Sequence, residues 1–369
     1  TYEEYFARIK SGDPSKLVVI IDEAQFVAKR DTSFMEAVAK LKKHKLYPGP
    51  VLIILATSST VWATQEAAEQ FKGAEMKLGS LNFLEVVRHF ESLPVAEIVR
   101  IYGAIGGVPA YLDKWDAAKS FKDNICRLVL TPSGALYGEA DAVISAELRE
   151  LSAYSTILAA IARGENKLND IFHATGFSRA KISVYLKNLA TFNIVEKVVS
   201  FETGGWENAK KGVYQIKDTF VNFWFKFVYP NMSNLYLLSP EEFYDTYIEK
   251  ELDAYLERYF REVCTEYLLI LNQMGQLPFT IKRVGTWIGK TGRIDIVAQS
   301  EDRRSIIGFC NWDKPMMTMD MCENMAMAMD QARLTSDDYY LFSATDFEPA
   351  LQSYVVRDPR FKLINMNEL

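Results

Sequence analysis

Two short apolar runs near the start of the chain have the pattern of buried parallel strands. Residues 17–21 read LVVII and residues 51–56 read VLIILA, with no polar residue inside either run. Between them, residues 34–43 alternate apolar side chains on one helical face with lysines on the other. A strand, a helix and a strand in this order predict a parallel α/β unit, with both strands buried on both faces.

The middle of the chain changes to short helices followed by two strands. The pattern predicts helices over residues 148–161, 167–174 and 179–192, and strands over residues 194–201 and 212–216. The two strands enclose a polar, glycine-containing loop. This order is typical of a winged helix-turn-helix.

The last third predicts one long helix, a β-meander, a second helix and a closing strand. The elements are, in order, a helix over residues 243–271, strands over 279–284, 292–299 and 305–312, a methionine-rich helix over 316–334 and a strand over 338–343. This order resembles the PD-(D/E)xK nuclease fold, which is also the restriction-endonuclease fold. That fold needs an Asp at the end of one strand and an E-x-K string on the next, because the acids bind Mg²⁺ and the Lys positions or activates water.

The nuclease motif is incomplete in this chain. Asp295 is present in the string GRIDIVA, but Phe309 and Asn311 stand where the motif has Glu and Lys. The resemblance also implies a helix Glu at the position that Arg261 occupies. One carboxylate cannot build the metal site. We therefore expect a degenerate, inactive domain in which Asp295 is a vestige, and which serves as a binding platform or as structural support.

Composition and charge limit the classes of partner. A chain of 369 residues with 49% hydrophobic and 13% aromatic residues is expected to form two or three folded domains. The net charge of −6 gives no chain-wide attraction to nucleic acid or to an anionic membrane, so a DNA contact must be a local patch.

Cysteine usage and hydropathy indicate a cytoplasmic protein. The four cysteines form no CxxC pair and, with three histidines, give no zinc-binding spacing. Reduced thiols in the cytoplasm are the simple interpretation. No apolar run approaches the roughly 18 residues of a membrane span, so no membrane partner is expected.

Two acidic residues directly follow the first apolar run. Asp22 and Glu23 lie at the carboxyl end of the predicted strand, where open α/β sheets bind ligands. In P-loop ATPases this is the Walker B arrangement, in which the first acid holds Mg²⁺ and the second polarises the attacking water. Thr57 and Ser58 end the neighbouring strand, at a position that can sense the γ-phosphate. The alternatives are an acidic strand end and an ordinary serine turn.

The phosphate-binding loop of such enzymes, G-x-x-x-x-G-K-[ST], is not found before Asp22. Residues 285–291 read GTWIGKT, with three residues between the glycines, and they lead into a strand. We predict a hairpin turn there, because phosphate binding needs a helix N-terminus. The chain begins at Thr1 without Met, which suggests a processed or fragmentary product.

Three strings in this order resemble the archaeal-type ATPase family: IDEAQF, the strand that ends in Thr-Ser-Ser, and GGVPAYL. These are STAND-like, AAA-like P-loop NTPases with a winged helix and a C-terminal domain of unknown function. The resemblance covers most of the chain. It implies ATP and Mg²⁺ as cofactors of an intact parent, hydrolysis that drives a conformational switch, and a helical lid whose GxP turn, here Gly107 and Pro109, contacts the nucleotide base.

We therefore predict an α/β multidomain protein with three parts. Residues 1–140 form a partial P-loop NTPase domain with a parallel sheet and a helical lid. Residues 141–235 form the winged helix-turn-helix, and residues 236–369 form the degenerate nuclease-like domain.

The winged helix offers candidate DNA-binding residues. Residues 145–216 contain nine Lys and Arg and seven Asp and Glu, a net charge of +2 by subtraction. The basic side chains placed to contact phosphates are Arg179, Lys181 and Lys187 on the third helix and Lys210 and Lys211 in the wing. Two alternatives to an ATPase stay open: a non-enzymatic module that binds duplex DNA, and a scaffold that binds a protein partner or forms a homo-oligomer.

Overall fold

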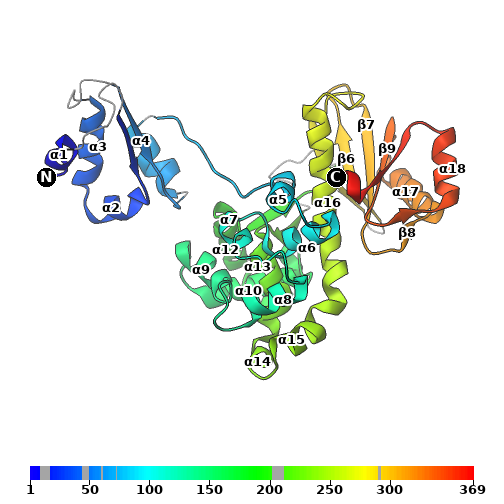
Figure 1. Cartoon of the computed structure of the whole chain (residues 1–369), viewed down its shortest axis with the longest axis horizontal. Coiled ribbons are helices and arrows are strands. Elements are labelled where there is room, and N and C mark those ends of the chain that lie inside the picture. The colour runs from blue at the N-terminus through cyan, green and yellow to red at the C-terminus, as the bar shows by residue number, and fades with distance from the viewer. Residues whose placement is uncertain (9–16, 44–49, 60, 72, 202–211, 290–291) are drawn as a thin grey trace. The chain divides into compact units, whose positions relative to one another are not determined.

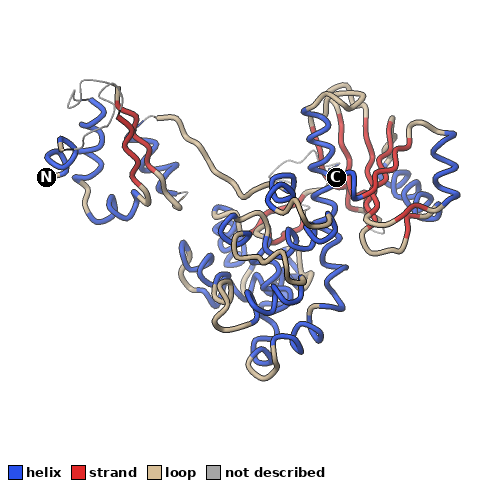
Figure 2. Tube along the Cα trace, viewed as in Figure 1, coloured by secondary structure: helices blue, strands red, loops and turns tan. Residues whose placement is uncertain are grey.

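A computed structural model describes residues 1–8, 17–43, 50–59, 61–71, 73–201, 212–289 and 292–369 (Figures 1 and 2). The protein is mixed α/β, mostly helical, with one five-stranded mixed sheet. It divides into two compact units, unit 1 (Thr1–Gly79) and unit 2 (Ser80–Leu369). The predicted domain boundaries at residues 140 and 235 stay a prediction. No described helix is long and apolar enough to cross a bilayer.

Unit 1 is built on two parallel strands, β1 (Leu17–Ile21) and β2 (Val51–Leu55). They pair residue by residue from Leu17 opposite Val51 to Ile21 opposite Leu55. The helical elements of the unit are α1 (Tyr2–Ala7), α2 (Ala24–Arg30), α3 (Ser33–Lys43), η1 (Trp62–Ala67) and α4 (Ala68–Phe71). Leu17 and Val19 pack with α3 in one apolar core.

The expectation that both strands are buried on both faces is wrong for one face. Val18 and Ile20 of β1 are 55% and 66% exposed, and Leu52 and Ile54 of β2 are 56% and 41% exposed. Alternate residues of a strand point to opposite faces, and α3 covers the face that carries Leu17 and Val19. A continuous apolar run shows that both faces are apolar, but it does not show that both are covered.

Unit 2 begins with a helical region and continues into the segment that the sequence predicts to be a winged helix. The helical region contains α5 (Phe83–His89), α6 (Val95–Ile105), α7 (Pro109–Leu112), α8 (Phe121–Ile125), the π-helical turn η2 (Cys126–Leu130) and α9 (Glu139–Glu147). This predicted winged helix contains α10 (Leu151–Ala162), α11 (Leu168–Thr175), α12 (Arg179–Thr191) and the antiparallel strands β3 (Val195–Val198) and β4 (Val213–Ile216). An aromatic segment follows, with α13 (Thr219–Phe223), η4 (Trp224–Val228), η5 (Tyr229–Asn231), α14 (Met232–Leu235) and α15 (Pro240–Tyr247).

The five-stranded sheet forms the last part of unit 2, in the order β11-β9-β7-β6-β5. Its strands are β5 (Arg283–Ile288), β6 (Arg293–Gln299), β7 (Ser305–Asn311), β9 (Asp338–Ser343) and β11 (Phe361–Asn365). Strands β7, β9 and β11 are parallel, whereas β6 and β5 run antiparallel to their neighbours. The remaining elements are β8 (Met316–Met317), α17 (Met319–Ala332), β10 (Asp346–Phe347), α18 (Pro349–Arg357) and η6 (Met366–Glu368).

Helices cover both faces of this sheet (Figure 1). The long helix α16 (Glu249–Gln273) packs on β6 and β7 from one side, and α17 and α18 pack from the other. The single helix expected over residues 243–271 is two helices, which meet at the buried Ile248. Ser239 starts the first of them with a capping box, so it begins before the predicted residue.

Helix α16 also bonds to the rest of unit 2. Arg258 Nη1 donates to the Ile216 carbonyl at the end of β4, 2.8 Å away. The Glu266 carboxylate accepts from the backbone N–H groups of Phe83 and Leu84 at 3.1 and 3.2 Å, which anchors the start of α5. The predicted winged helix and the sheet are therefore both bonded to or packed on α16.

Candidate functional site

The carboxyl ends of β1 and β2 bring Glu23 and Ser58 into contact. Glu23 Oε2 accepts hydrogen bonds from Ser58 Oγ at 2.8 Å and from the Ser58 N–H at 3.2 Å. The backbone bonds continue past the strands, with Ala56 N–H donating to the Ile21 carbonyl and Ala24 N–H donating to the Ala56 carbonyl. These bonds fix the two loops side by side, as expected for neighbouring parallel strands.

Gln25 completes this cluster and was not predicted from the sequence. It is 2% exposed. Its Nε2 donates to Glu23 Oε2 and to Ser58 Oγ, the latter at 3.2 Å. Its Oε1 is buried and finds no hydrogen-bond partner among the residues that the structure describes. The sequence does contain a signal for Gln25, because it is the one polar residue in AQFVA, residues 24–28, which follow Asp22 and Glu23.

Glu23 combines an unusual backbone with a stabilised charge. Its φ of 48° and ψ of 42° lie in the left-handed region, which costs a residue with a side chain about 1 kcal/mol or more. Hydrogen bonds from Gln25 and then from Ser58 lower the pKa of the Glu23 carboxyl below its ordinary value. A left-handed backbone at a residue with a side chain is found often at functional sites, and here it lies at the edge of the sheet.

Asp22 and Thr57 flank this contact. Asp22 is exposed, and its Oδ1 accepts from the Glu23 N–H at 2.9 Å. Thr57 is half-buried, and its Oγ1 accepts from the Ser59 N–H at 3.0 Å. Carboxylate and hydroxyl oxygens suit Mg²⁺, which commonly takes one or two carboxylates and completes its shell with water and phosphate oxygens. The donor set therefore fits Mg²⁺ with phosphate, although the described residues form no cluster of three or more metal-ligating side chains.

Gly107 and Pro109, predicted to contact a nucleotide base, belong to unit 2. Gly107 is buried, and its carbonyl accepts from the Leu81 N–H at 2.8 Å. A Cβ at position 107 would lie 1.9 Å from the Leu81 carbonyl oxygen. Pro109 is exposed at the first turn of α7. Packing accounts for Gly107, and the base contact stays a prediction.

The three basic residues predicted on the third helix of the winged helix are all exposed on α12. Arg179 lies over the Phe172 ring at 4.0 Å and donates to Asn169. Lys181 Nζ lies 4.4 Å from the centre of the Phe177 ring. Lys187 is exposed on the same helix, about 1.7 turns after Lys181. Lys210 and Lys211 lie outside the described residues.

Asp295, which the sequence predicts to be a vestigial nuclease acid, is 8% exposed and hydrogen-bonded through both carboxylate oxygens. Its Oδ1 accepts from Arg261 Nε at 2.9 Å and from Arg293 Nε at 3.0 Å. Its Oδ2 accepts from the Cys310 N–H at 3.1 Å. Two guanidinium groups thus pair with this carboxylate, and one of them, Arg261, stands where the predicted nuclease resemblance implies a Glu.

The match to a known protein family lies in unit 2. Residues 224–327 match the family DUF234, archaea bacterial proteins of unknown function. An uncharacterized protein of Methanocaldococcus jannaschii is 28% identical over 319 residues, which are 84% of this chain and 70% of that protein.

Two solved structures are partly similar. The Walker-type ATPase of Pyrococcus abyssi is 18% identical with a TM-score of 0.35, over 57% of this chain and 63% of that chain. The chain thus spans less than two thirds of that ATPase. A Vibrio cholerae protein is 10% identical with a TM-score of 0.24, over 96% of this chain and 88% of that chain.

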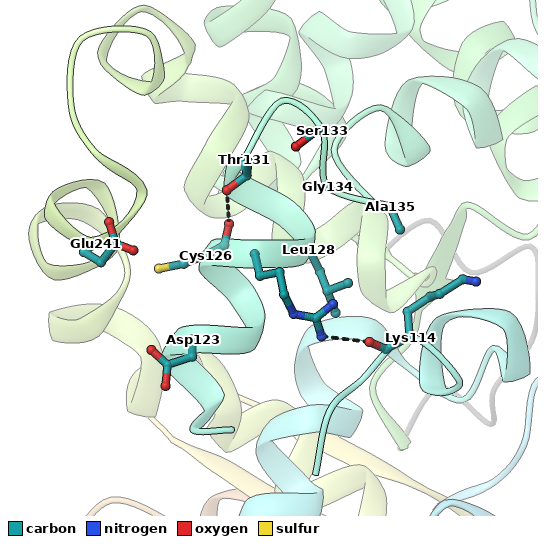
Figure 3. A pocket seen from close by; sticks show the side chains of 10 residues that line it. Lys114, Asp123, Cys126, Leu128, Thr131, Ser133, Gly134, Ala135 and Glu241 are labelled. Atoms are coloured by element: carbon teal, nitrogen blue, oxygen red, sulfur yellow. Dashed lines mark hydrogen bonds between the residues drawn. The ribbon is translucent and has the colours of Figure 1, made fainter. Parts of the chain in front are cut away.

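A surface pocket of about 450 Å³ lies elsewhere in unit 2 (Figure 3). Lys114 and Arg127 supply positive charge to its lining, and Asp123 and Glu241 supply negative charge. Arg127 already donates to the Lys114 carbonyl at 2.9 Å. No residue predicted from the sequence lines this pocket, and its mixed charge selects no ligand class.

Proposed function

We propose that unit 1 carries the water-activating half of a Mg²⁺–ATP hydrolysis site in a P-loop ATPase-like protein. The observation that supports this proposal is the contact of Glu23 with Ser58 across the carboxyl ends of two parallel strands. Open α/β sheets bind ligands at this edge. The 369 residues contain no phosphate-binding loop, so the proposal assigns the loop to a longer parent protein.

Each residue has one task in this proposal. Asp22 holds Mg²⁺, which neutralises phosphate charge when it is bound. Glu23, ionised at neutral pH like any ordinary Glu, accepts a hydrogen bond from the attacking water. Thr57 and Ser58 donate to the γ-phosphate. Ser58 and Gln25 both donate to Glu23 Oε2, and a change of these bonds on nucleotide binding would link the state of the nucleotide to the loops around it.

Calorimetric binding of ATP and Mg²⁺ tests this proposal, on this chain and on a version extended upstream in its source gene. We expect the extended chain to bind and hydrolyse ATP, and its Glu23→Gln variant to bind ATP but to turn over at least roughly 10²-fold more slowly. Glu36→Gln, on the exposed face of α3, is the matched control and is expected to keep full activity. Unchanged turnover in Glu23→Gln would show that the role of Glu23 is wrong, and failure of both chains to bind would refute the whole proposal.

The sheet of unit 2 has no nuclease role in this proposal. Arg261 and Arg293 occupy the Asp295 carboxylate that a metal would need. A role as a binding platform or as structural support, including oligomerisation, fits the bonded network around it.

A second function, duplex DNA binding by the winged helix, is favoured by one observation. The sequence of α12, RAKISVYLKNLAT, has no acidic residue, and Arg179, Lys181 and Lys187 are exposed on it. Such cations bind phosphates with a strong dependence on salt. We expect binding to random-sequence duplex DNA that weakens as salt rises, and that weakens further in the Lys181→Ala, Lys187→Ala double variant. Lys250→Ala, an exposed lysine of α16, is the control, and an equal response of the control and the double variant would contradict this function.

A further inference from the structure

Two of the four cysteines meet where α16 packs on β7. Cys264 lies on α16 and is fully buried, whereas Cys310 lies on β7 and is half-buried. The two thiols are hydrogen-bonded to each other. Cys310 also belongs to the side chains that pack against the apolar core containing Cys264. The two sulfur atoms are therefore neighbours, although the residues are far apart in the sequence.

The backbone on both sides of this thiol pair is held by one carboxylate. Arg261, about one turn before Cys264 on α16, donates through Nε to Asp295 Oδ1 at 2.9 Å. Asp295 Oδ2 accepts from the Cys310 N–H at 3.1 Å. The same side chain is thus bonded to the helix beside one cysteine and to the strand at the other. These bonds keep the two sulfur atoms together before any reaction takes place.

The two thiols differ in their access to solvent. Cys264 has no exposed surface, and burial, followed by the hydrogen bond to Cys310, raises the pKa of its thiol well above the ordinary value. Cys310 is the member of the pair that solvent reaches. A small dissolved oxidant therefore meets Cys310 first, and Cys264 is placed to react second. An accessible cysteine with a second cysteine beside it is the arrangement found in redox-sensing proteins.

We propose that Cys264 and Cys310 are a redox-sensitive pair, which hydrogen peroxide converts reversibly to a disulfide between α16 and β7. The Cys310 sulfur attacks one peroxide oxygen, the O–O bond breaks, and water leaves while Cys310 becomes a sulfenic acid. The Cys264 sulfur then attacks the Cys310 sulfur, the S–O bond breaks, and a second water leaves with the hydrogen of the Cys264 thiol. The two thiols thus lose two electrons and two protons, and the peroxide is reduced to two waters. A dithiol reductant reverses the bond by thiol–disulfide exchange.

The disulfide would add a covalent link to a helix that already holds other parts of unit 2. Helix α16 bonds to the end of β4 through Arg258 and to the start of α5 through Glu266. In a reducing compartment, the disulfides that do form are usually transient and catalytic or redox-sensing. The inference depends neither on nucleotide hydrolysis nor on DNA binding.

The test counts free thiols after the full, reduced, folded chain has been treated with hydrogen peroxide. Catalase stops the reaction, the chain is unfolded and alkylated with iodoacetamide, and the intact mass gives the number of alkylated cysteines. We expect this number to fall from four to two per chain, and dithiothreitol added before alkylation to restore four. A protease digest of the oxidised chain should contain a peptide pair that joins Cys264 to Cys310.

Cys310→Ser should keep all of its remaining thiols under the same treatment. Cys322→Ser is the matched control, because Cys322 is also half-buried, and this variant should still lose two thiols. If Cys310→Ser fails to fold, as judged by circular dichroism, the peptide map of the wild-type chain decides the matter alone. A chain that keeps four free thiols, a disulfide between other cysteines or between two chains, or a Cys310 sulfinic acid with Cys264 still free would each overturn the inference.

Discussion

Gly107 is a residue at which packing alone requires glycine. By resemblance, the GGVPAYL string predicts a turn that contacts a nucleotide base, and that contact stays a prediction. In the structure Gly107 lies under the backbone of Leu81, and the bond from Leu81 N–H to the Gly107 carbonyl locks the two segments together. Glycine is needed there because any Cβ would overlap a carbonyl oxygen that cannot rotate away.

Gly107→Ala should therefore destabilise unit 2 even without any nucleotide. Overpacking against backbone is expected to lower the free energy of unfolding by at least about 2 kcal/mol, which a urea titration followed by circular dichroism would measure. Gly138→Ala is the control, because a Cβ there has nothing within 4 Å. Equal midpoints for the two variants would contradict the packing account of Gly107.

Also at the scale of residues, the sequence predicts the polar residues that follow each strand, but it does not predict Gln25, which bonds the two strand ends together. Asp22, Glu23, Thr57 and Ser58 could be found because each follows an apolar run, and parallel strands end at the same edge. Gln25 could not, since its role depends on a bond across 33 residues to Ser58. The catalytic and sensing roles themselves stay predictions.

At the scale of elements, the ends of β6 and β7 and the middle of α16 meet at Asp295. The carboxylate joins a helix guanidinium, a strand guanidinium and a backbone N–H. A buried ion pair is often no better than an apolar contact, but removing one partner leaves a charge without compensation.

Asp295→Ala should for this reason cost about 3 kcal/mol of the free energy of unfolding. Chemical denaturation of the variant and the wild-type chain measures the difference. The control is Asp302→Ala, which removes an exposed ion pair with Arg304 and a hydrogen bond from Ser300, and which should lower the midpoint less than Asp295→Ala does. If Asp295→Ala were as stable as the wild type, the network would have no structural role.

The elements themselves were predicted unevenly, for physical reasons. Strands β1, β2 and β9 begin at the predicted residues, because apolar runs with sharp polar ends define them. The open face of β1 and β2 was missed, since burial depends on a second layer that local pattern does not encode. Strand β11 and helix α18 were also missed. Their mixed polar pattern becomes clear only when β11 pairs with β9.

At the scale of the whole molecule, the two units differ in the extent of their hydrophobic cores. Unit 1 has a small core behind a two-stranded sheet. Unit 2 has a core that runs without interruption from α5 through the winged helix and α16 to one face of the five-stranded sheet. The net charge of −6 is a property of the whole chain, whereas the basic face of α12 is local, so charge over the whole chain is a poor guide to partners.

The length of α16 has a mechanical consequence. Its 25 residues span about 37 Å as a helix. It is clamped to the sheet through Arg261, to the wing strand through Arg258 and to α5 through Glu266. Because one helix makes all three contacts, a displacement of β4 or α5 relative to the sheet would have to break a bond to α16 or move the helix with it.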